Sequence, residues 1–208
     1  MGSCIIFCAG GFRQLAQPVT SEDLVIAADG GFLHTQALNI TPQIILGDFD
    51  SLGYVPETST QFPVEKDDTD AMLAVRQGLD RGFDRFVLYG SLDGPRLDHT
   101  VANFQTLLFL ADHGARGYLV GVNQVATVVR NGELVFPAGC QGDISLFALG
   151  GEAKGVSVRG LHYSLEEGTL SPAFPLGVSN HFTGQSATIR VEEGNLLVIY
   201  SCQNGLPV

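Results

Sequence analysis

Residues 85–112 have the sequence RFVLYGSLDGPRLDHTVANFQTLLFLAD, and this stretch decides the fold class. It begins with the apolar run Arg85–Tyr89, continues through a loop rich in glycine and aspartate, and ends in residues 98–112, which have helical periodicity. Four apolar residues of that last segment fall on one face of a helix: Val101, Phe104, Leu108 and Ala111. The stretch therefore predicts a buried strand, a loop and an amphipathic helix in succession.

The same alternation extends over the N-terminal half of the chain. Residues 69–81 predict a second helix, because Met72, Val75 and Leu79 recur at helical spacing. Between the helical segments lie short runs that are apolar throughout, as in strands covered on both faces: Cys4–Ala9, Leu24–Ala28, Ile44–Leu46, Arg85–Tyr89 and Gly117–Gly121. This alternation predicts a Rossmann-like α/β domain with a mostly parallel sheet over residues 1–122.

The helical pattern stops after Asn123. Short β-rich runs follow, separated by turns that contain glycine or proline: Val125–Arg130, Glu133–Phe136, Asp143–Ala148, Lys154–Arg159, Ser186–Val191 and Leu196–Tyr200. Asn131–Gly132 stands between two of these runs and is a strong hairpin signal. Residues 123–208 therefore predict a second, all-β domain, a small antiparallel sandwich or barrel.

The composition limits the possible partners. Of the 208 residues, 45% are hydrophobic and 16% are charged, which is an ordinary globular composition. The net charge of −11 argues against a nucleic-acid partner, because binding a phosphate backbone requires more lysine and arginine than this chain has. A phosphate ligand is compatible with this charge if metal ions neutralise it, and the field of the protein favours a cationic small substrate.

The cysteines indicate a reducing environment. Cys4, Cys8, Cys140 and Cys202 form no CxxC pair and have no histidine at zinc-ligand spacing. Cys4 and Cys8 lie in the apolar run CIIFCA and are expected to be buried core thiols. The start of the chain lacks the basic segment of a secretory signal, and no apolar run approaches the roughly 20 residues that span a bilayer. We therefore expect a reduced, cytoplasmic protein without a membrane partner.

Acidic residues follow the predicted strands of the α/β domain. In open α/β sheets, ligands bind beyond the carboxyl ends of the strands. Four strand–loop junctions carry aspartates to that edge: Asp29-Gly30-Gly31, Gly47-Asp48-Phe49-Asp50-Ser51, Glu65-Lys66-Asp67-Asp68-Thr69-Asp70 and Gly90–His99. The sequence therefore places a candidate site at one edge of one sheet.

Asp48 and Asp50 form the most informative acidic pair. If their loop is extended, the two side chains point the same way, with Cα atoms roughly 6.5 Å apart. Two bare carboxylates at that separation repel by about 2–3 kcal/mol at an effective dielectric constant near 20. A divalent cation between them removes this repulsion, and such hard oxygen ligands suit Mg²⁺. The alternative for a single aspartate, such as Asp67 or Asp98, is a role in a turn or a helix cap.

The basic residues of these loops each have two interpretations. Arg96 is the one basic residue between Gly94 and His99. Its guanidinium suits a phosphate held through two hydrogen bonds, but it can equally pair with Asp93 or Asp98. Lys66 is ambiguous in the same way.

Gly30, His99 and Asn103 are weaker candidates. Gly30 stands at a predicted helix start, where a glycine lets the backbone approach a phosphate, but an ordinary turn also explains it. His99 and Asn103 are one helical turn apart, so both can face the site. A solvated helix face explains these two residues nearly as well.

Together these motifs resemble the ordered motif set of thiamine pyrophosphokinases. The N-terminal half carries Ala28-Asp29-Gly30-Gly31, Gly47-Asp48-Phe49-Asp50-Ser51, Lys66-Asp67-Asp68-Thr69-Asp70 and Gly94-Pro95-Arg96-Leu97-Asp98-His99, followed by Asn103. The C-terminal half continues the resemblance with Gly160-Leu161-His162-Tyr163-Ser164-Leu165 and Val178-Ser179-Asn180. Each motif is short, but their order and spacing together are specific, and they span nearly the whole chain.

The resemblance implies a division of labour between two domains. Residues 1–122 are expected to bind ATP and Mg²⁺ in an α/β domain, and residues 123–208 to bind thiamine in a β-sandwich. A homodimer is expected, with each active site built from the α/β domain of one subunit and the sandwich of the other. The expected reaction is in-line attack of the thiamine hydroxyl on the β-phosphorus of Mg-ATP, which yields thiamine diphosphate and AMP.

The resemblance also implies a role for each matching residue. The metal ligands are expected to be Asp48, Asp50 and Asp70. With Arg96 these three form the expected catalytic set, in which Asp70 is the preferred acceptor of the hydroxyl proton. The remaining residues on the ATP side are Asp29, Gly30, Lys66, Asp98, His99 and Asn103. The expected thiamine-side residues are Tyr163, Ser179 and Asn180. Tyr163 departs from members of the family that have tryptophan there, and it offers less area for stacking on a ring.

Two further hypotheses remain open from the sequence. One is another enzyme with the same acidic cluster, either a pterin-type pyrophosphokinase or a Mg²⁺-dependent phosphohydrolase. The other is a nucleotide- or thiamine-binding protein without turnover. The complete acid set together with Arg96 disfavours the binding protein, and the segments Gly160–Tyr163 and Ser179–Asn180 favour a thiamine enzyme over its relatives.

Overall fold

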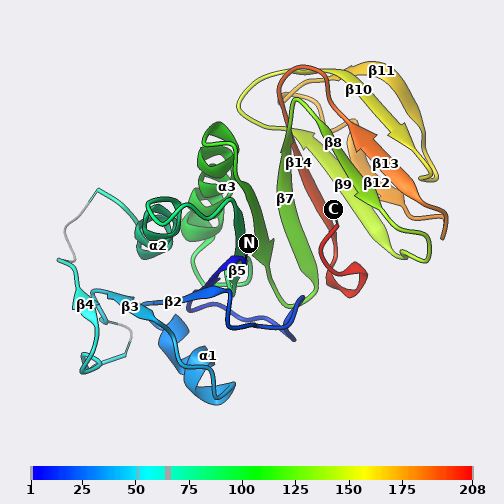
Figure 1. Ribbon diagram of the computed structural model, residues 1–208. Helices are drawn as coiled ribbons and strands as arrows, with labels where there is room; N and C mark the ends of the chain where they lie inside the picture. The colour runs from blue at the N-terminus through cyan, green and yellow to red at the C-terminus, as the bar shows by residue number, and fades with distance from the viewer. Residues whose placement is uncertain (1, 51, 64–66, 208) are drawn as a thin grey trace. The chain divides into compact units, whose positions relative to one another are not determined.

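The protein consists of two compact units, Met1–Val122 and Asn123–Val208. A computed structural model, shown in Figure 1, describes residues 2–50, 52–63 and 67–207. Of the predicted site residues, Lys66 lies outside the described residues. Within the described ranges, no helix is long and apolar enough to cross a membrane.

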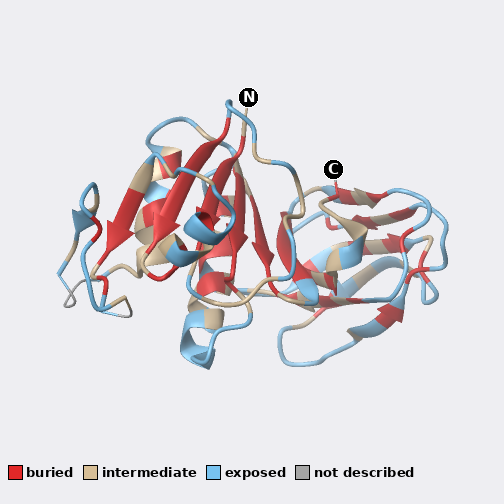
Figure 2. Ribbon diagram, turned by 90° about the horizontal axis from the view of Figure 1, so that it is seen from below, coloured by how far each residue is buried: buried red, intermediate tan, exposed pale blue. Residues whose placement is uncertain are grey.

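The first unit is built on a parallel sheet, as predicted. Its strands follow the order β6-β5-β1-β2-β3-β4, and every neighbouring pair is parallel. The strands are β1 Cys4–Phe7, β2 Leu24–Ala28, β3 Ile44–Gly47, β4 Thr60–Gln61, β5 Arg85–Tyr89 and β6 Arg116–Val120. All residues of β1 and β2 are buried, which explains why these runs are apolar throughout and do not alternate (Figure 2).

Helices cover both faces of this sheet. Helix α1, Gly31–Ala37, lies on one face, whereas α2, Asp70–Leu79, and α3, Leu97–Asp112, lie on the other (Figure 1). This distribution follows from right-handed crossovers, because the chain moves one way along the sheet through α1 and the opposite way through α2 and α3. The chain adds strands on one side of β1 and later on its other side. Such a change of side creates a crevice at the carboxyl ends of the strands.

Helix α3 buries a different stripe from the one that its apolar residues predict. The buried residues are Asn103, Thr106, Leu107 and Leu110, whereas Val101 is 51% exposed. The reason lies in β6, where Gly117 leaves its Cβ position open and the side chains of Leu107 and Leu110 pack there against the strand. A glycine in the sheet thus sets the rotation of the helix that covers it.

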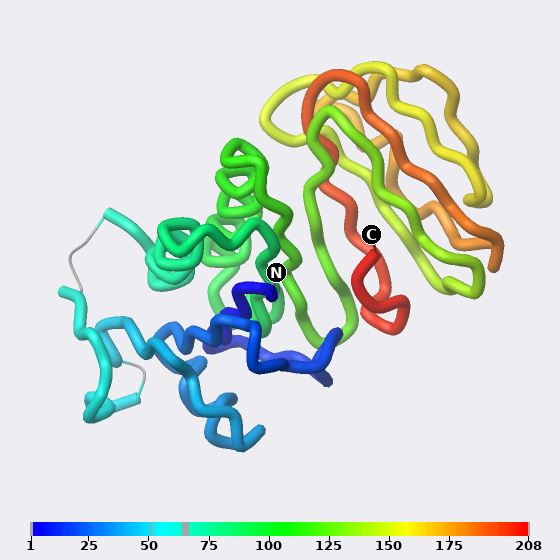
Figure 3. Tube along the Cα trace, viewed as in Figure 1, coloured from blue at the N-terminus to red at the C-terminus, as the bar shows by residue number. Residues whose placement is uncertain are grey.

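The second unit consists of antiparallel β-strands. One set of strands follows the order β12-β9-β14-β7, and a separate four-stranded sheet has the order β11-β10-β13-β8. The strands are β7 Gln124–Arg130, β8 Glu133–Phe136, β9 Asp143–Ala148, β10 Ala153–Arg159, β11 Leu165–Leu170, β12 Gly177–His181, β13 Ala187–Arg190 and β14 Asn195–Ser201. The trace in Figure 3 lets the reader follow this run of hairpins from yellow-green to red.

Aromatic side chains join the two layers of the second unit. Phe136 of β8 contacts Tyr200 of β14, with ring centroids 4.9 Å apart and the rings nearly perpendicular. Residues of β9 alternate between buried and less buried positions, as expected of a strand with one face in the core. The unit is therefore the predicted all-β domain, with its core between two antiparallel layers.

Candidate active site

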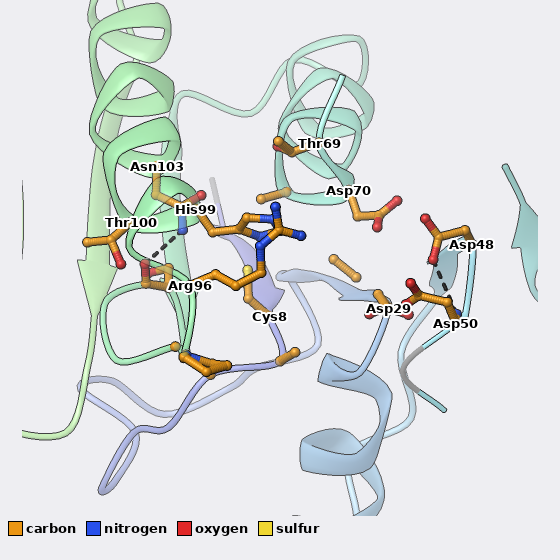
Figure 4. Close-up of a pocket in the computed structure, with 18 of the residues that line it drawn as sticks. Cys8, Asp29, Asp48, Asp50, Thr69, Asp70, Arg96, His99, Thr100 and Asn103 are labelled. Carbon is orange, nitrogen blue, oxygen red and sulfur yellow. Dashed lines mark hydrogen bonds between the residues drawn. The ribbon is translucent and has the colours of Figure 1, made fainter. Parts of the chain in front are cut away.

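The first unit contains a pocket of about 640 Å³ at the carboxyl ends of its parallel strands. Segments that follow β1, β2, β3 and β5, together with the start of α2, line this pocket. Figure 4 shows carboxylates on one side of it and Arg96 with His99 on the other. The predicted edge of the sheet is therefore the edge at which the pocket lies.

Three carboxylates meet in this pocket. Asp29, Asp48 and Asp50 each offer an oxygen atom, and these atoms lie within 4.8 Å of one another. Among the described residues, this is the group of histidine, cysteine and acidic side chains whose ligand atoms lie close enough together to hold a metal ion. A donor set of carboxylate oxygens alone suits a hard cation such as Mg²⁺.

Phe49 fixes the two acids that flank it. Its ring is buried in a small cluster with Ala27 and Ile45, whereas Asp48 and Asp50 line the pocket. The residue adopts φ 61°, and the Asp50 amide donates a hydrogen bond of 3.2 Å to Oδ1 of Asp48. An aromatic residue rarely adopts positive φ, so burial of the ring holds a strained turn that presents both carboxylates to the pocket.

Asp29 reaches the same point because Gly47 leaves room for it. Asp29 adopts φ 47° directly after β2, and its backbone amide donates a hydrogen bond of 2.8 Å to the Leu46 carbonyl. An added Cβ at Gly47, which has φ 150°, would lie 3.0 Å from Cα of Asp29. The glycine therefore allows the ends of β2 and β3 to approach closely enough for their acids to meet.

Asp70 enters the pocket from the first turn of α2. The preceding residue, Thr69, caps this helix, since its Oγ1 accepts a hydrogen bond of 3.2 Å from the Met72 amide. Asp70 lines the pocket, and its carboxylate points toward Asp48 in Figure 4. A carboxylate at a helix N-terminus is stabilised by the helix dipole, which helps to offset repulsion from the neighbouring acids.

Arg96 and Asp98 form an exposed ion pair at the start of α3. Nη2 of Arg96 lies 2.6 Å from Oδ2 of Asp98, and Nε lies 3.3 Å from Oδ1. The hydrogen bond from Arg96 holds the pKa of the Asp98 carboxyl below its ordinary value. Arg96 lines the pocket, whereas Asp98 does not. Of the two roles considered for Arg96, binding a phosphate or pairing with an aspartate, the structure contains the pairing with Asp98.

Asn103 and His99 both line the pocket from α3. Asn103 is buried, and its Nδ2 donates a hydrogen bond of 2.7 Å to the Ser91 carbonyl. Oγ of Ser91 in turn donates to the Leu88 carbonyl at 2.7 Å. Asn103 thus ties the helix to the loop after β5, whereas His99 is exposed at the rim. A solvated helix face explains His99 but not Asn103.

Several pocket residues were not among the individual candidates from the sequence. Cys8 was expected in the core but lines the pocket, because the chain leaves the sheet after Phe7 at the same edge as the acids. The small polar residues Thr69, Ser91 and Thr100 line it as well. Their place directly after a strand or at a helix start is the pattern that would have indicated them. Gly30, by contrast, is buried as the N-cap residue of α1 and is not among the lining residues.

Tyr163 and Asn180 come together in the second unit. Nδ2 of Asn180 donates a hydrogen bond of 2.7 Å to the Tyr163 carbonyl, and the Tyr163 amide donates one of 2.9 Å to Oδ1 of Asn180. The Tyr163 side chain remains exposed, whereas Asn180 is buried. The side-chain amide of Asn180 therefore makes the two hydrogen bonds that the backbone of a neighbouring strand would make. These bonds fix the backbone of Tyr163 below its exposed ring.

Ser179 lies in an irregular stretch of β12. The pairing of β12 with β9 shifts in register between Gly177 and Asn180, and Ser179 adopts φ 61° there. Its amide donates a hydrogen bond of 3.1 Å to Oγ of Ser145. A bulge of this kind redirects side chains at the edge of a sheet, and it places Ser179 on the exposed surface next to Asn180.

Comparison with known proteins identifies the family of the chain. Residues 15–119 match the family model of the thiamin pyrophosphokinase catalytic domain, and residues 137–196 match that of the thiamin pyrophosphokinase vitamin B1 binding domain. A search of curated protein sequences gave no match. The first of the two family models alone covers half of the chain.

Solved structures with these names have the same fold. Thiamine pyrophosphokinase from Bacillus subtilis is 23% identical, with a TM-score of 0.85 over 97% of this chain and 99% of that chain. A thiamin pyrophosphokinase family protein from Enterococcus faecalis is 25% identical, with a TM-score of 0.79 over 97% and 99% of the two chains. The Candida albicans enzyme is 13% identical, with a TM-score of 0.73 over 96% and 88%. The motif resemblance is thus confirmed, and the chain belongs to the thiamin pyrophosphokinase family of enzymes.

Proposed function

We propose that this protein transfers the diphosphoryl group of ATP to thiamine and releases AMP. The observation that carries the proposal is the meeting of Asp29, Asp48 and Asp50 within 4.8 Å in the pocket that Arg96 also lines. Such a pocket offers carboxylate ligands for a divalent cation on one side and a guanidinium for phosphate oxygens on the other. Membership of the family supports thiamine as the substrate that accepts the diphosphoryl group.

The chemistry requires little beyond positioning and charge neutralisation. The thiamine hydroxyl oxygen forms a bond to the β-phosphorus of ATP, and the bond from that phosphorus to the oxygen shared with the α-phosphorus breaks. The electron pair of the broken bond leaves with AMP. The hydroxyl proton passes to a carboxylate, for which Asp70 is the candidate, because it lines the pocket on the side of the acids.

Asp29, Asp48 and Asp50 would hold Mg²⁺, with Asp70 beside them. When bound, the ion neutralises phosphate charge that the carboxylates would otherwise repel. Arg96 donates to phosphate oxygens from the opposite side of the pocket. Asn103 keeps the loop after β5 in place through its bond to the Ser91 carbonyl, so the wall that carries Arg96 is held relative to the sheet.

The thiamine ring is assigned to the second unit, next to Tyr163, Ser179 and Asn180. Tyr163 presents an exposed ring on a fixed backbone, and such a ring can stack on a heterocycle or face a cation. We further propose a homodimer in which the first unit of one subunit and the second unit of its partner share each active site. The motif set places ATP-side residues before residue 122 and thiamine-side residues after it, which supports this division.

A product assay tests the proposed function. Purified protein is incubated with ATP, MgCl₂ and thiamine, and the nucleotides and thiamine esters are separated by chromatography. AMP and thiamine diphosphate in equal amounts, with no thiamine monophosphate, are expected. ADP with thiamine monophosphate would indicate a single phosphoryl transfer. Phosphate release from ATP in the absence of thiamine would indicate a phosphohydrolase. A parallel reaction with a pterin alcohol in place of thiamine tests for a pterin-type pyrophosphokinase.

A further inference from the structure

Three exposed rings form a cluster beside the proposed thiamine residues. The His162 and Tyr163 rings meet edge-on with centroids 4.6 Å apart, and the His162 and His181 rings lie 6.3 Å apart. We call His162, Tyr163 and His181 the ring cluster. All three residues are exposed in the second unit. Exposed aromatic and imidazole rings that cluster around one point form a surface suited to a planar heterocycle.

The backbone beneath the ring cluster is fixed. The His162 amide donates a hydrogen bond of 3.0 Å to the His181 carbonyl, and Leu161 pairs with Phe182 in an antiparallel bridge. Oδ1 of Asn180 accepts from the amides of both Tyr163 and His181, each at 2.9 Å. The rings therefore stand on two segments that are bonded to each other, so a ligand would meet a largely preformed surface.

Asp143 sets the orientation and the tautomer of His181. The two residues are directly opposite each other on β9 and β12, and Nδ1 of His181 lies 2.6 Å from Oδ1 of Asp143. An ionised carboxylate only accepts hydrogen bonds, so the proton of the neutral imidazole is on Nδ1. Nε2 then carries a lone pair, and about half of the side chain, 52%, is exposed. His181 is thus a positioned hydrogen-bond acceptor in the ring cluster.

We propose that His181 is a specificity-determining residue that accepts a hydrogen bond from an amino group on the heterocycle held against Tyr163, and that Asp143 is its positioning residue. The proposal rests on the proposed function, since thiamine carries one such donor, the amino group of its pyrimidine ring. An exposed hydrogen bond between two side chains contributes little to stability, so folding alone does not account for the pair His181–Asp143. A site built to bond a donor discriminates strongly against an analogue that lacks it.

Two substrates and one variant test the acceptor role. Oxythiamine has an oxygen in place of the pyrimidine amino group, so it offers an acceptor where thiamine offers a donor. The wild-type protein is expected to prefer thiamine over oxythiamine in kcat/KM. His181→Phe keeps a ring but removes the acceptor, and it is expected to lower that preference by about tenfold or more, the size of one hydrogen bond to a positioned group. The KM for ATP is expected to stay unchanged.

Asp143 is tested by a conservative and a disruptive substitution. Asp143→Asn retains an oxygen that can accept from Nδ1 of His181, whereas Asp143→Ala removes it. We expect Asp143→Asn to retain most of the preference for thiamine and Asp143→Ala to approach His181→Phe. His113→Phe is the matched control, because His113 is an exposed histidine at the end of α3 in the first unit, and its variant should behave as wild type.

The outcomes separate this inference from the proposed function. Absence of AMP formation from ATP and thiamine in the wild type would overturn both. Thiamine diphosphate formation with an unchanged thiamine preference in His181→Phe would overturn the inference alone. An equal loss for both substrates would also overturn it, since such a loss indicates a structural role. Calorimetric binding of thiamine and oxythiamine, with thermal melting of each variant, gives the same comparison without turnover.

Discussion

Asn180 and Tyr163 exchange two hydrogen bonds, one from Nδ2 to the Tyr163 carbonyl at 2.7 Å and one from the Tyr163 amide to Oδ1 at 2.9 Å. This is the bond pattern of two residues paired across antiparallel strands, except that a side chain supplies one half of it. The arrangement keeps an exposed tyrosine over a rigid backbone. Rigidity of that kind lowers the ordering cost when a ligand binds to the ring.

Asn180→Ala tests this arrangement. The variant loses these two hydrogen bonds and the one that Oδ1 accepts from the His181 amide, so the second unit is expected to lose about 3 kcal/mol of unfolding free energy, or about 1 kcal/mol per bond. The KM for thiamine should rise, because the Tyr163 ring is no longer held. Urea unfolding and steady-state kinetics measure the two effects. Asn180→Asp retains Oδ1 for the two amides but sets a carboxylate oxygen, in place of Nδ2, against the Tyr163 carbonyl, so it should also be less stable than the wild type. Wild-type stability in either variant would contradict the account.

Asp48 and Asp50 are expected to be essential for turnover but not for folding. Asp48→Asn or Asp50→Asn removes a charge without removing volume, and kcat/KM should fall about 100-fold or more if each carboxylate holds the metal. Stability should stay the same or rise, since like charges in the cluster repel. Activity is measured over a MgCl₂ titration, with thermal melting as the fold control.

Asp80→Asn is the matched control for these two variants, because Asp80 is an exposed aspartate at the other end of α2. Its activity and its dependence on MgCl₂ should equal those of the wild type. Near-normal activity of Asp48→Asn and Asp50→Asn at ordinary MgCl₂ would remove the metal assignment.

Substitutions in the two units are expected to change different kinetic parameters. Tyr163→Ala should raise mainly the KM for thiamine, because it removes a ring from the second unit. Arg96→Ala should lower kcat or raise the KM for ATP, because it removes the guanidinium from the pocket of the acids. Both substrates are varied independently for each variant. Selective weakening of ATP binding by Tyr163→Ala would reverse the assignment.

Cys4 predicts a pH dependence of stability. Burial raises the pKa of its thiol to about 12 from 9.0. Between those values the unfolded chain releases the proton and the folded protein keeps it, so stability falls as pH rises above 9 and is unaffected below it. From pH 8 to pH 10 the loss due to this one group is about 1.4 kcal/mol.

Comparing Cys4→Ala with the wild type isolates the Cys4 contribution. The variant leaves a small void, which lowers stability by a similar amount at every pH, so only the pH-dependent part reports on the thiol. Urea unfolding at pH 8 and pH 10 should show a smaller decrease for Cys4→Ala. Equal decreases in the two proteins would show that the thiol does not titrate as predicted.

Subunit complementation tests whether two chains share each active site. Asp50→Asn carries its defect in the first unit, and a Tyr163→Ala, Ser179→Ala double variant carries its defects in the second. In a twofold dimer with shared sites, the mixed dimer has one site with all defects and one site with none, so about half of the wild-type activity should return. Exchange is verified with two affinity tags. Absence of recovery after demonstrated exchange would place each site within one chain.

The apolar runs predicted most strands of the structure because those strands are buried. Three strands gave no such signal: β4 with the sequence TQ, β11 with LEEGTL and β12 with GVSNH. All three are polar and largely exposed, and each lies at the end of the strand order of its sheet. A strand at an edge has one side without a neighbour and little buried surface, so hydrophobic periodicity does not mark it.

The acids of the pocket were predictable from their position after strands, but the geometry around them was not. Asp48, Asp50 and Asp70 were the expected metal ligands, and the carboxylates whose oxygen atoms lie within 4.8 Å of one another are those of Asp29, Asp48 and Asp50. Asp29 joins this cluster through positive φ and through the open Cβ position of Gly47, neither of which is visible in a pattern of residue types. The presence of Asp29 in the carboxylate cluster therefore depends on the backbone conformation at Asp29 and Gly47.

The central place of β1 in its sheet has a consequence for synthesis of the chain. Strand β1 pairs with β2 on one side and with β5 on the other, where Phe7 is opposite Tyr89. At ribosomal rates of about 5–20 residues per second, the second partner follows roughly 4–16 seconds after the first strand. During that interval the run CIIF has an open edge, which invites pairing with other nascent chains. Slow translation before Tyr89 should therefore favour chaperone capture and aggregation, although the finished protein buries that strand completely.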